Sequence, residues 1–546
     1  MLKLQIISTT FPAGHKLWVA RDPQGISQWS AGSERHRAMG QPLPGDEVYQ
    51  RLSVLQARGP LGSLARLAAA LGSQGIAPGP GLGDPGHILA AGLGILQEAV
   101  AGRIVFQDRL MSLLRDEGLW PLEAARLLDY ASYHGLVEQL PGISRLSWGA
   151  LRCNRCGGQN VVFEPCPVCR RRECPLCTDC LTLGASRGCR ILVSAPFSGK
   201  AFSGEADFTL AYQLTPAQVR AAAQLEEFWQ SPSQRTLVWA ACGAGKTEVT
   251  YPLMRRALRE GHQVLFAVPR QDVVRELAER FRSAFTGVEI AVHYGGQPWQ
   301  AQGQLVIATT HQVLHFYQRF GLAILDEVDA FPYHGSEMLR FGLIRALGPK
   351  GKLVEMSATP NPVPRKGTAV TIPVRHHGYP LPEPEFVKSR SGEIPPAILK
   401  LIEESPHQWI VFVPTVAACE ELAAALREKL REKVAACHSR HPQRHEEIKA
   451  FRYGEKRIIV ATAVLERGVT FPGVQVVVVD ADHPVFSRSA LVQMAGRVGR
   501  TADHPSGTVV LCGTRKNGAI KGAQAMIKQL NQEGAELGLL KGEGYA

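Results

Sequence analysis

The sequence predicts a protein of the α/β class in which two parallel-sheet lobes follow an N-terminal extension and a cysteine-rich module. Its 546 residues are too many for a single hydrophobic core, so three or four domains are expected. Apolar runs of strand length alternate with helical patterns in two separate stretches, an order typical of parallel sheets. Eight of the twelve cysteines lie between Cys153 and Cys189, ahead of both stretches.

Residues 1–105 form an N-terminal region whose function the sequence does not reveal. Glycine and proline are concentrated in parts of it, for example over residues 77–81. Residues 2–10 and 16–20 have the composition of strands in a small domain. Helical periodicity further on predicts a helical segment, which we place at 106–150.

A zinc-binding module is predicted over residues 151–192. Most of its cysteines come in pairs separated by two residues, the spacing with which small metal sites bind tetrahedral zinc through four thiolates. Eight thiolates are enough for two ions, and the spacing does not assign each thiolate to an ion. A redox pair and a set of inert buried thiols are the alternatives, but charged residues crowd the segment and leave little core for thiols to enter. We expect the lobes to fold without this module.

The first lobe, residues 208–372, begins with a candidate phosphate-binding loop. An apolar run at 237–241 predicts a buried strand, and residues 242–247 then read Cys-Gly-Ala-Gly-Lys-Thr before a helical pattern. Backbone N–H groups of such a loop surround phosphates, while its lysine and hydroxyl reach phosphate and Mg²⁺. A chance loop with this sequence is the alternative. The candidate ATP-binding residues here are Gly243, Ala244, Gly245, Lys246 and Thr247.

An acidic pair, Asp326 and Glu327, follows the apolar run at 322–325. At the mouth of a buried strand, one carboxylate can hold Mg²⁺ and its neighbour can polarise the attacking water. Acidic residues also follow strands as ordinary turn or cap residues, so the pair alone is weak evidence. Together with the upstream loop, it predicts an ATPase with Lys246, Asp326 and Glu327 as catalytic residues.

A proline-rich linker over residues 373–396 leads to the second lobe, residues 397–535. Strand-like runs recur there near 409–413, 434–437, 458–461, 474–479 and 508–511. After a further helical run, Arg497 and Arg500 would lie on one side of a helix or tight turn. If they face the nucleotide across the cleft, they act as arginine fingers and make hydrolysis depend on lobe closure. A solvent-exposed basic helix end is the alternative.

Composition indicates a cytoplasmic protein with an anionic partner. The net charge is +12, although the basic residues are scattered and a solvated surface would also explain them. No apolar stretch is long enough to cross a bilayer, and the first eight residues lack the order of a secretory signal. In a reducing compartment, clustered cysteines bind metal more often than they form disulfides.

The order of short motifs across both lobes resembles that of superfamily 2 helicases and translocases, whose two lobes are RecA-like. The resemblance implies that Gln218, in the segment Leu-Thr-Pro-Ala-Gln, reads the adenine of ATP. Hydroxyls, amides and an arginine at strand ends can hold phosphates without reading bases, as a translocase requires. The resemblance assigns nucleic-acid contact or coupling to Arg270, Thr310, Ser357, Thr359, Thr415, Thr462, Arg467 and Gln493.

The position of the cysteines gives a closer resemblance. They precede the motor, whereas in the replication-restart helicase PriA they lie between its later motifs. With the stretch Asp-Glu-Val-Asp-Ala-Phe-Pro-Tyr at 326–333, this order resembles the ComFA family of late-competence DNA translocases. The family's four zinc ligands match Cys153, Cys156, Cys177 and Cys180. The additional thiols, which could hold a second zinc, are Cys166, Cys169, Cys174 and Cys189.

The ComFA resemblance also implies a function and partners. It implies an ATPase at the inner face of the cytoplasmic membrane, without a transmembrane segment, that helps pull single-stranded DNA through the ComEC channel, with ComFC and DprA as partners. ATP, Mg²⁺ and Zn²⁺ are the expected cofactors. The alternatives are a PriA-like replication-restart helicase, which would prefer forked duplex, and a zinc- and DNA-binding scaffold with a weak ATPase. The complete set of motif residues argues against the scaffold.

Overall fold

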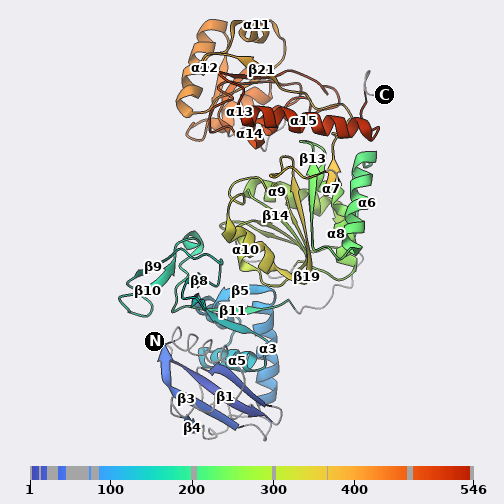
Figure 1. Ribbon diagram of the computed structural model, residues 1–546. Helices are drawn as coiled ribbons and strands as arrows, with labels where there is room; N and C mark the ends of the chain where they lie inside the picture. The colour runs from blue at the N-terminus through green and yellow to red at the C-terminus, as the bar shows by residue number, and fades with distance from the viewer. Residues whose placement is uncertain are drawn as a thin grey trace.

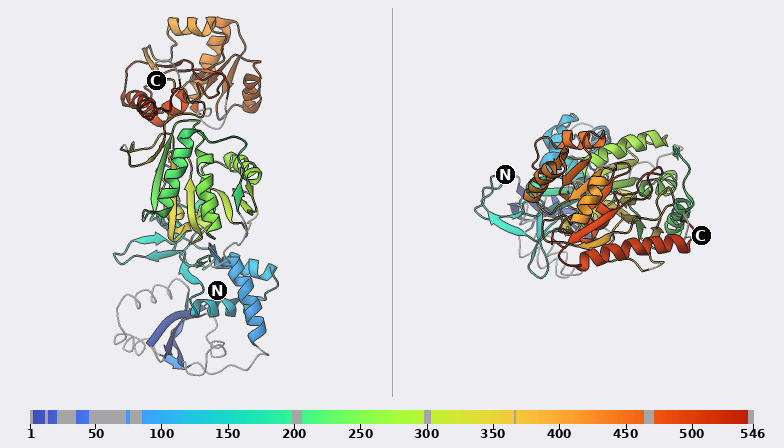
Figure 2. Two further views of the ribbon diagram at one scale, coloured as in Figure 1. Left: turned by 90° about the vertical axis from the view of Figure 1, so that its right-hand side faces the viewer. Right: turned by 90° about the horizontal axis from the view of Figure 1, so that it is seen from above.

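The computed structural model describes residues 3–11, 14–20, 35–44, 73–75, 85–197, 206–297, 303–365, 367–463 and 471–541. The chain forms a column, with the N-terminal region at one end, the first lobe in the middle and the second lobe at the other end (Figure 1, Figure 2). Among the described residues, no helix is both long enough and apolar enough to span a membrane.

An antiparallel sheet in the order β2-β1-β3-β4 lies at the N-terminal end (Figure 1). β1 (Lys3–Phe11) pairs with β2 (Gly14–Ala20) on one side and with β3 (Arg35–Pro44) on the other, and β4 (Ser73–Gly75) pairs with β3. The two predicted strands are thereby confirmed as β1 and β2.

A small α/β unit follows and carries the cysteines. Three helices, α3 (Pro85–Val100), α4 (Gln107–Asp116) and α5 (Pro121–Tyr133), pack on a three-stranded antiparallel sheet. The sheet order is β5-β11-β6, with β5 (Arg103–Phe106), β6 (Glu138–Pro141) and β11 (Ile191–Ala195). The segment predicted to be helical over 106–150 is helical only as far as Tyr133, since β6 and later strands follow. Because β11 lies between β5 and β6, one sheet closes both ends of the cysteine segment.

The cysteine segment itself is built from two short antiparallel pairs. β7 (Ile143–Arg145) pairs with β8 (Leu151–Cys153), and β9 (Val161–Glu164) pairs with β10 (Cys174–Cys177). A single 3-10 turn, η2 (Leu181–Leu183), follows. The segment has few apolar side chains of its own.

Lobe 1 is a seven-stranded parallel sheet in the order β16-β17-β14-β18-β19-β13-β20 (Figure 1). Its central strands are buried along most of their length, which explains their continuous apolar sequences. The strands are β13 (Arg235–Ala240), β14 (Val264–Val268), β16 (Ile290–His293), β17 (Leu305–Thr309), β18 (Phe320–Leu325), β19 (Leu347–Ser357) and β20 (Val370–Ile372). The helices include α6 (Pro216–Gln230), α8 (Tyr251–Arg259), α9 (Gln271–Ala284) and α10 (Glu337–Ala346).

Lobe 2 is a six-stranded parallel sheet in the order β21-β26-β25-β22-β24-β23. Within the stretch expected as a linker, β21 (Glu385–Lys388) forms the edge of this sheet. The other strands are β22 (Trp409–Phe412), β23 (Val434–Cys437), β24 (Ile458–Ala461), β25 (Gln475–Val478) and β26 (Val509–Gly513). The helices are α11 (Pro396–Glu404), α12 (Val416–Leu430), α13 (Arg444–Arg452), α14 (Arg488–Ala495) and α15 (Gly518–Glu536).

The two lobes are in direct contact. One hydrophobic cluster continues from lobe 1 into lobe 2. Cys242 and Ala358 of lobe 1 line the same small pocket as Val492 and Ala495 of lobe 2. The predicted fold class, two RecA-like lobes behind a cysteine-rich module and an N-terminal extension, is confirmed.

Candidate active site and metal centres

The predicted phosphate-binding loop is a tight turn between β13 and α7 (Lys246–Val249). Gly243 and Gly245 have φ angles of 82° and 72°, in the left-handed region that a Cβ disfavours. A Cβ on Gly245 would also lie 2.3 Å from the side-chain nitrogen of Gln218. The turn therefore requires glycine, and it places Lys246 and Thr247 in the first turn of α7. This is the geometry of a loop whose N–H groups surround phosphates.

Gln218, the predicted adenine contact, is hydrogen-bonded to the main chain of the phosphate-binding loop. Its Nε2 donates to the carbonyl of Ala244 at 3.0 Å, and its Oε1 accepts from the N–H of Thr215 at 2.9 Å. The second bond is half of a capping box at the start of α6. Both ends of the amide are therefore engaged within lobe 1, and adenine contact stays a prediction that requires the amide to turn.

The predicted catalytic residues of lobe 1 meet at the end of β18. Lys246 Nζ lies 3.0 Å from Asp326 Oδ1, and the same oxygen accepts from the N–H of Glu327 at 2.8 Å. Burial lowers the pKa of Lys246, but the attraction of Asp326, Glu327 and Asp329 outweighs this effect, so the pKa is raised. Glu327 has a φ of 55°, a backbone conformation that is uncommon for a residue with a Cβ and that is concentrated at functional sites.

Asp329, the last acid of the acidic motif, lies within hydrogen-bond distance of hydroxyls from both lobes. Its two carboxylate oxygens accept 2.6 Å hydrogen bonds from Ser357 Oγ and Thr359 Oγ1. Ser489 Oγ of α14 in lobe 2 lies 2.9 Å from the same carboxylate and 2.6 Å from Thr359 Oγ1, so its single hydroxyl hydrogen is donated to one of these two oxygens. The two predicted coupling hydroxyls thus lie where the lobes meet. The sequence did not single out Ser489, although it stands four residues before Gln493.

Of the two predicted arginines of lobe 2, Arg500 lies near the phosphate-binding loop. Arg497 is buried and Arg500 is half-buried, with Arg500 Nε donating to the carbonyl of Gly496 at 2.9 Å. Burial lowers the pKa of Arg500, whereas Cys242 and Glu327 raise it. The guanidinium of Arg500 is therefore within electrostatic reach of the candidate catalytic carboxylate, which does not fit a solvent-exposed helix end.

Residues 496–500, which carry both arginines, are called the arginine segment. Gln493, just before this segment, contacts the phosphate-binding loop. Its Oε1 accepts from the thiol of Cys242 at 3.5 Å. The approach is close at Gly496 too, where a Cβ would lie 2.6 Å from that of Cys242. Lobe 2 is thus packed directly on the first residue of the phosphate-binding loop.

Arg375, in the stretch expected as a linker, is a residue that sequence reasoning missed. It is buried and donates only to main-chain carbonyls: Cys242 at 3.0 Å, Gly496 at 3.1 Å, Val498 at 2.5 Å and Gly499. Burial lowers its pKa to about 10, so it remains a cation at neutral pH. One side chain therefore fastens the loop of lobe 1 to the arginine segment of lobe 2. A lone arginine in a proline-rich stretch carries no motif that would have revealed this role.

A cavity of about 360 Å³ lies between the lobes beside the acidic motif. Its lining includes Arg270, Phe331, Ser487 and Ser489. Phe331 is 86% exposed, which is unusual for an aromatic side chain. Arg270 therefore lines a cavity between the lobes, and its contact with nucleic acid stays a prediction. Thr310 does not line this cavity: it is only 3% exposed, and its N–H donates to the carbonyl of Val268 at 3.0 Å.

Of the nucleic-acid or coupling residues predicted in lobe 2, the structure describes Thr415 and Thr462 but not Arg467. Thr415 is exposed and caps α12, with its hydroxyl accepting from the N–H of Ala418 at 3.1 Å. Thr462 is half-buried at the end of β24, and its N–H donates to the carbonyl of Cys437 at 3.2 Å. Arg467 lies outside the described residues.

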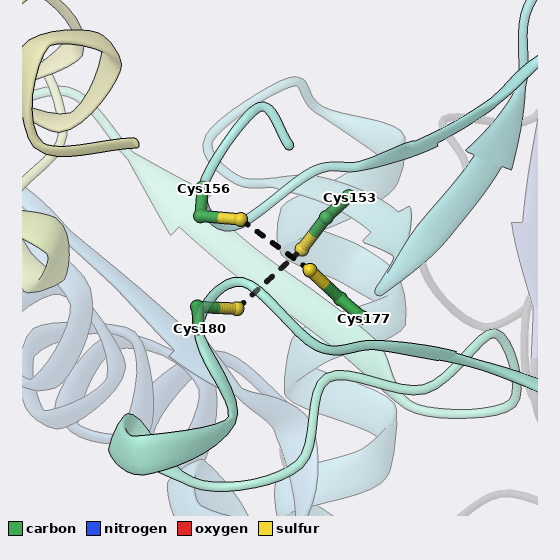
Figure 3. A group of neighbouring side chains, drawn as sticks. All are labelled: Cys153, Cys156, Cys177 and Cys180. Carbon is green, nitrogen blue, oxygen red and sulfur yellow. Dashed lines mark hydrogen bonds between the residues drawn. The ribbon is translucent and has the colours of Figure 1, made fainter. Parts of the chain in front are cut away.

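Four cysteines converge in a first cluster, Cys153, Cys156, Cys177 and Cys180, with their sulfurs turned toward one another (Figure 3). The Sγ atoms of Cys153 and Cys180 are 3.8 Å apart, and those of Cys156 and Cys177 are 3.6 Å apart. Zn–S bonds of about 2.3 Å in a tetrahedron put sulfurs about 3.8 Å apart, so the spacing fits zinc. Hydrogen bonds from the other three thiols lower the pKa of Cys153, which favours a thiolate ligand.

The other four cysteines form a second cluster, Cys166, Cys169, Cys174 and Cys189. The Sγ atoms of Cys166 and Cys189 are 3.6 Å apart, and hydrogen bonding with Cys189 lowers the pKa of Cys174 to about 5. β10 begins at Cys174 of this cluster and ends at Cys177 of the first. The structure therefore groups the eight thiols into the two sets expected from the family pattern. The four-residue strand β10 joins the two clusters.

The first cluster belongs to the core of lobe 1. Its four cysteines share a hydrophobic cluster with residues of β14, β17 and β18 and with Leu339 and Leu343 of α10. Arg345, also on α10, donates to the carbonyls of Asn154 and Arg155. The expectation that the lobes fold without the cysteine module stays a prediction, although the packing of this cluster on one face of lobe 1 does not favour it. Among the described residues, the second cluster forms a small hydrophobic cluster of its own, separate from the core of lobe 1.

Models of known families match three consecutive parts of the chain. The ComFA N-terminal domain model matches residues 103–194, the span from β5 to β11. A model named for the res subunit of type III restriction enzymes matches residues 211–362 in lobe 1. The helicase conserved C-terminal domain model matches residues 394–502 in lobe 2. The order of the models is that of the domains in the structure.

The competence protein ComFA of Bacillus subtilis is 34% identical over 457 residues, which cover 79% of this chain and 97% of that protein. The chain belongs to the ComFA family. A second member, from Streptococcus pneumoniae, is also 34% identical, over 73% of this chain and 94% of that protein. The structure of RecG bound to a three-way DNA junction matches 61% of this chain and 48% of that one, with 20% identity and a TM-score of 0.42.

Family membership and the helicase-domain matches identify a helicase-like, ATP-hydrolysing enzyme. The motif residues of this ComFA family member are those of a closed two-lobed site. Lys246, Asp326 and Glu327 come from lobe 1. From lobe 2, Gln493 contacts Cys242 of the phosphate-binding loop, and Arg500 lies within electrostatic reach of Glu327.

Proposed function

We propose that this chain is an ATP-dependent translocase on single-stranded DNA that serves the uptake of transforming DNA across the cytoplasmic membrane during competence. The observation that carries the proposal is the shared ATP site, in which Gln493 and Arg500 of lobe 2 meet the loop and acids of lobe 1. Because this site is complete only when the lobes are in contact, ATP hydrolysis is coupled to lobe movement. Family membership supports the competence role.

The residues at the site fit ATP with Mg²⁺, since Gly243 and Gly245 let the loop between β13 and α7 curl around phosphates and the half-buried Lys246 follows directly. We assign phosphate binding to Lys246 and the N–H groups of 243–247, and metal ligation to Thr247 and Asp326. Mg²⁺ supplies charge that stabilises the transferring phosphoryl group. Glu327 orients and polarises the attacking water. Arg497 and Arg500 stabilise the charge that develops on the phosphate oxygens.

Glu327→Gln tests the assignment of the water-polarising residue. The variant keeps the fold and the metal-holding Asp326 but loses the base, so kcat for DNA-stimulated hydrolysis is expected to fall about 10²- to 10³-fold while ATP binding is retained. ATPase rates and binding of a fluorescent nucleotide measure the two effects. Glu337→Gln, at an exposed acid on α10, is the matched control. Wild-type turnover in Glu327→Gln would contradict the assignment.

The cavity between the lobes supports contact with a single strand. Arg270 offers a cation for phosphate, and the exposed ring of Phe331 offers a face on which a base can stack. Neither side chain reads base identity, as a translocase requires. Preference for forked duplex over plain single strands would instead favour a replication-restart helicase.

We assign one zinc ion to each cysteine cluster, because each brings four Sγ atoms within 4.8 Å of one another, close enough for four thiolates to share one tetrahedral ion. By family resemblance, the protein acts at the inner face of the cytoplasmic membrane, with the ComEC channel, ComFC and DprA as partners. Reconstituted DNA transport with these partners, with and without ATP, is the test of that assignment.

A further inference from the structure

A cavity of about 640 Å³ lies where the α/β unit that carries the cysteines meets lobe 1, away from the interlobe cavity. Its walls come from β5 and α4, from the cysteine segment, from the residues that follow β16, and from η3 (Gln312–His315). The volume is within the range of about 300–1,000 Å³ that is usual for ligand sites. The motor mechanism described above makes no use of this cavity.

The lining of the cavity is strongly basic. Four guanidinium groups belong to it, those of Arg103, Arg109, Arg155 and Arg190. Among the lining residues that the structure describes, Asp108 is the single carboxylate, and Arg190 binds both of its oxygens at 2.7 and 2.8 Å. Burial, followed by repulsion from Arg319 and Arg109, lowers the pKa of Arg103 to about 10, so it is still charged at neutral pH. The positive charges are therefore mutually repulsive and outnumber the acid that faces them.

Two of these cations, Arg155 and Arg190, are held in fixed positions. Arg155 donates to the carbonyls of Cys180 at 2.7 Å, Leu183 at 3.0 Å and Gly184 at 2.5 Å, and to Cys180 Sγ at 2.9 Å. The guanidinium of Arg190 lies 3.8 Å from the ring centre of Phe106. Side chains that are already immobilised lose little entropy when an anion binds. The cavity is thus arranged in advance for a negatively charged ligand.

An aromatic ring and amides accompany the charges. Tyr294 is half-buried in the lining, and its hydroxyl accepts from Gln297 Nε2 at 2.8 Å. Arg275 lies over the same ring at 4.8 Å from its centre. Alternating guanidinium groups and aromatic rings are typical of proteins that hold a nucleic-acid strand without reading its sequence.

The cavity borders a predicted nucleic-acid-contacting stretch of lobe 1 only in sequence. Gln312 lines it and comes two residues after Thr310, the predicted contact, whose own side chain is buried. We propose that this basic cavity binds the phosphodiester backbone of single-stranded DNA and extends the DNA path from lobe 1 onto the cysteine-bearing unit. This inference rests on the proposed function, and it gives that unit a direct role in gripping the strand.

Arg109→Glu tests the proposal. Arg109 is exposed on α4, so reversing its charge leaves the core intact, and Arg115→Glu, exposed on the same helix but outside the lining, is the matched control. Gln297→Glu is a second variant, from the lobe 1 wall. Fluorescence anisotropy with oligothymidylates of about 6 and about 30 nucleotides, at several salt concentrations, measures the affinity.

The expected result is that Arg109→Glu and Gln297→Glu weaken binding of the long strand about 5-fold or more, and that Arg109→Glu makes log Kd less dependent on log salt by roughly 0.7. The short strand, which the lobes alone can hold, and the Arg115→Glu control bind as wild type does. Equal affinities for Arg109→Glu and Arg115→Glu overturn the inference, as does weakening of free phosphate or mononucleotide binding without an effect on the strand. If the wild-type ATPase does not respond to single-stranded DNA, the proposed function fails first.

Discussion

Arg375 shows how one buried side chain can join the two halves of an ATP site. Its guanidinium reaches the carbonyl of Cys242 in lobe 1 and three carbonyls of the arginine segment in lobe 2. Gly499 can carry no side chain there, because a Cβ would lie 2.9 Å from Arg375 NH1. Any separation of the lobes at this point must break hydrogen bonds from a buried cation, which costs free energy in proportion to their number.

Arg375→Met is expected to lower DNA-stimulated kcat at least about 10-fold, because it leaves buried carbonyls without a donor and releases Arg500 from the loop. KM for ATP should change less, since the phosphate contacts remain. Arg390→Met, an exposed arginine of the same stretch, is the control. Steady-state kinetics separates the two constants. An unchanged kcat, in a variant that remains folded by circular dichroism, would show that the site closes without Arg375.

The same residues show what a sequence can and cannot predict about this site. Lys246, Asp326 and Glu327 follow strands at fixed offsets, so local spacing was enough to find them. Arg375 and Ser489 act through partners more than 100 residues away, and Arg375 binds main-chain carbonyls, which leave no residue pattern. Long-range contacts of this kind depend on the packing of two sheets, which the sequence predicts only in outline.

At the level of elements, α10 follows the acidic motif in the chain and contacts the segment that carries the first cysteine cluster. It begins eight residues after Asp329 and carries Arg345, which binds the main chain beside Cys153 and Cys156. Phe341 of the same helix lies 4.9 Å beneath the guanidinium of Arg152. The strands of both lobes were predictable because buried parallel strands are apolar throughout. The packing of the cysteine segment on α10 could not be predicted, since α10 contacts main-chain carbonyls of that segment and places an aromatic ring against Arg152.

Removal of each metal should therefore have different consequences. Cys177→Ser with Cys180→Ser is expected to lower zinc content from two ions to one and to lower the Tm of lobe 1 by several degrees, because these thiols lie in its core. Cys166→Ser with Cys169→Ser should remove one zinc while leaving that Tm unchanged, because the second cluster packs within itself. Elemental analysis and thermal unfolding measure both quantities. Equal losses of Tm in the two variants would contradict the separation.

At the scale of the whole molecule, the two cavities proposed to hold DNA lie at different junctions of the column. The interlobe cavity with Arg270 and Phe331 lies between the lobes, and the basic cavity lies on the far side of lobe 1, where the cysteine-bearing unit attaches. ATP-driven movement of lobe 2 would change the first contact while the second stays fixed to lobe 1. Stepping along a strand requires two binding sites for the strand, one of which changes its contact with the strand when ATP is bound or hydrolysed.

The most direct measurement is the steady-state ATPase rate of the full chain with single-stranded DNA, duplex DNA and RNA side by side. A motor whose site is completed by lobe closure on a single strand should hydrolyse ATP at least about 10-fold faster with single-stranded DNA than without nucleic acid. Duplex should stimulate it less, and Glu327→Gln should abolish the response. Equal rates with and without single-stranded DNA would contradict the central claim that strand binding and hydrolysis are coupled in this molecule.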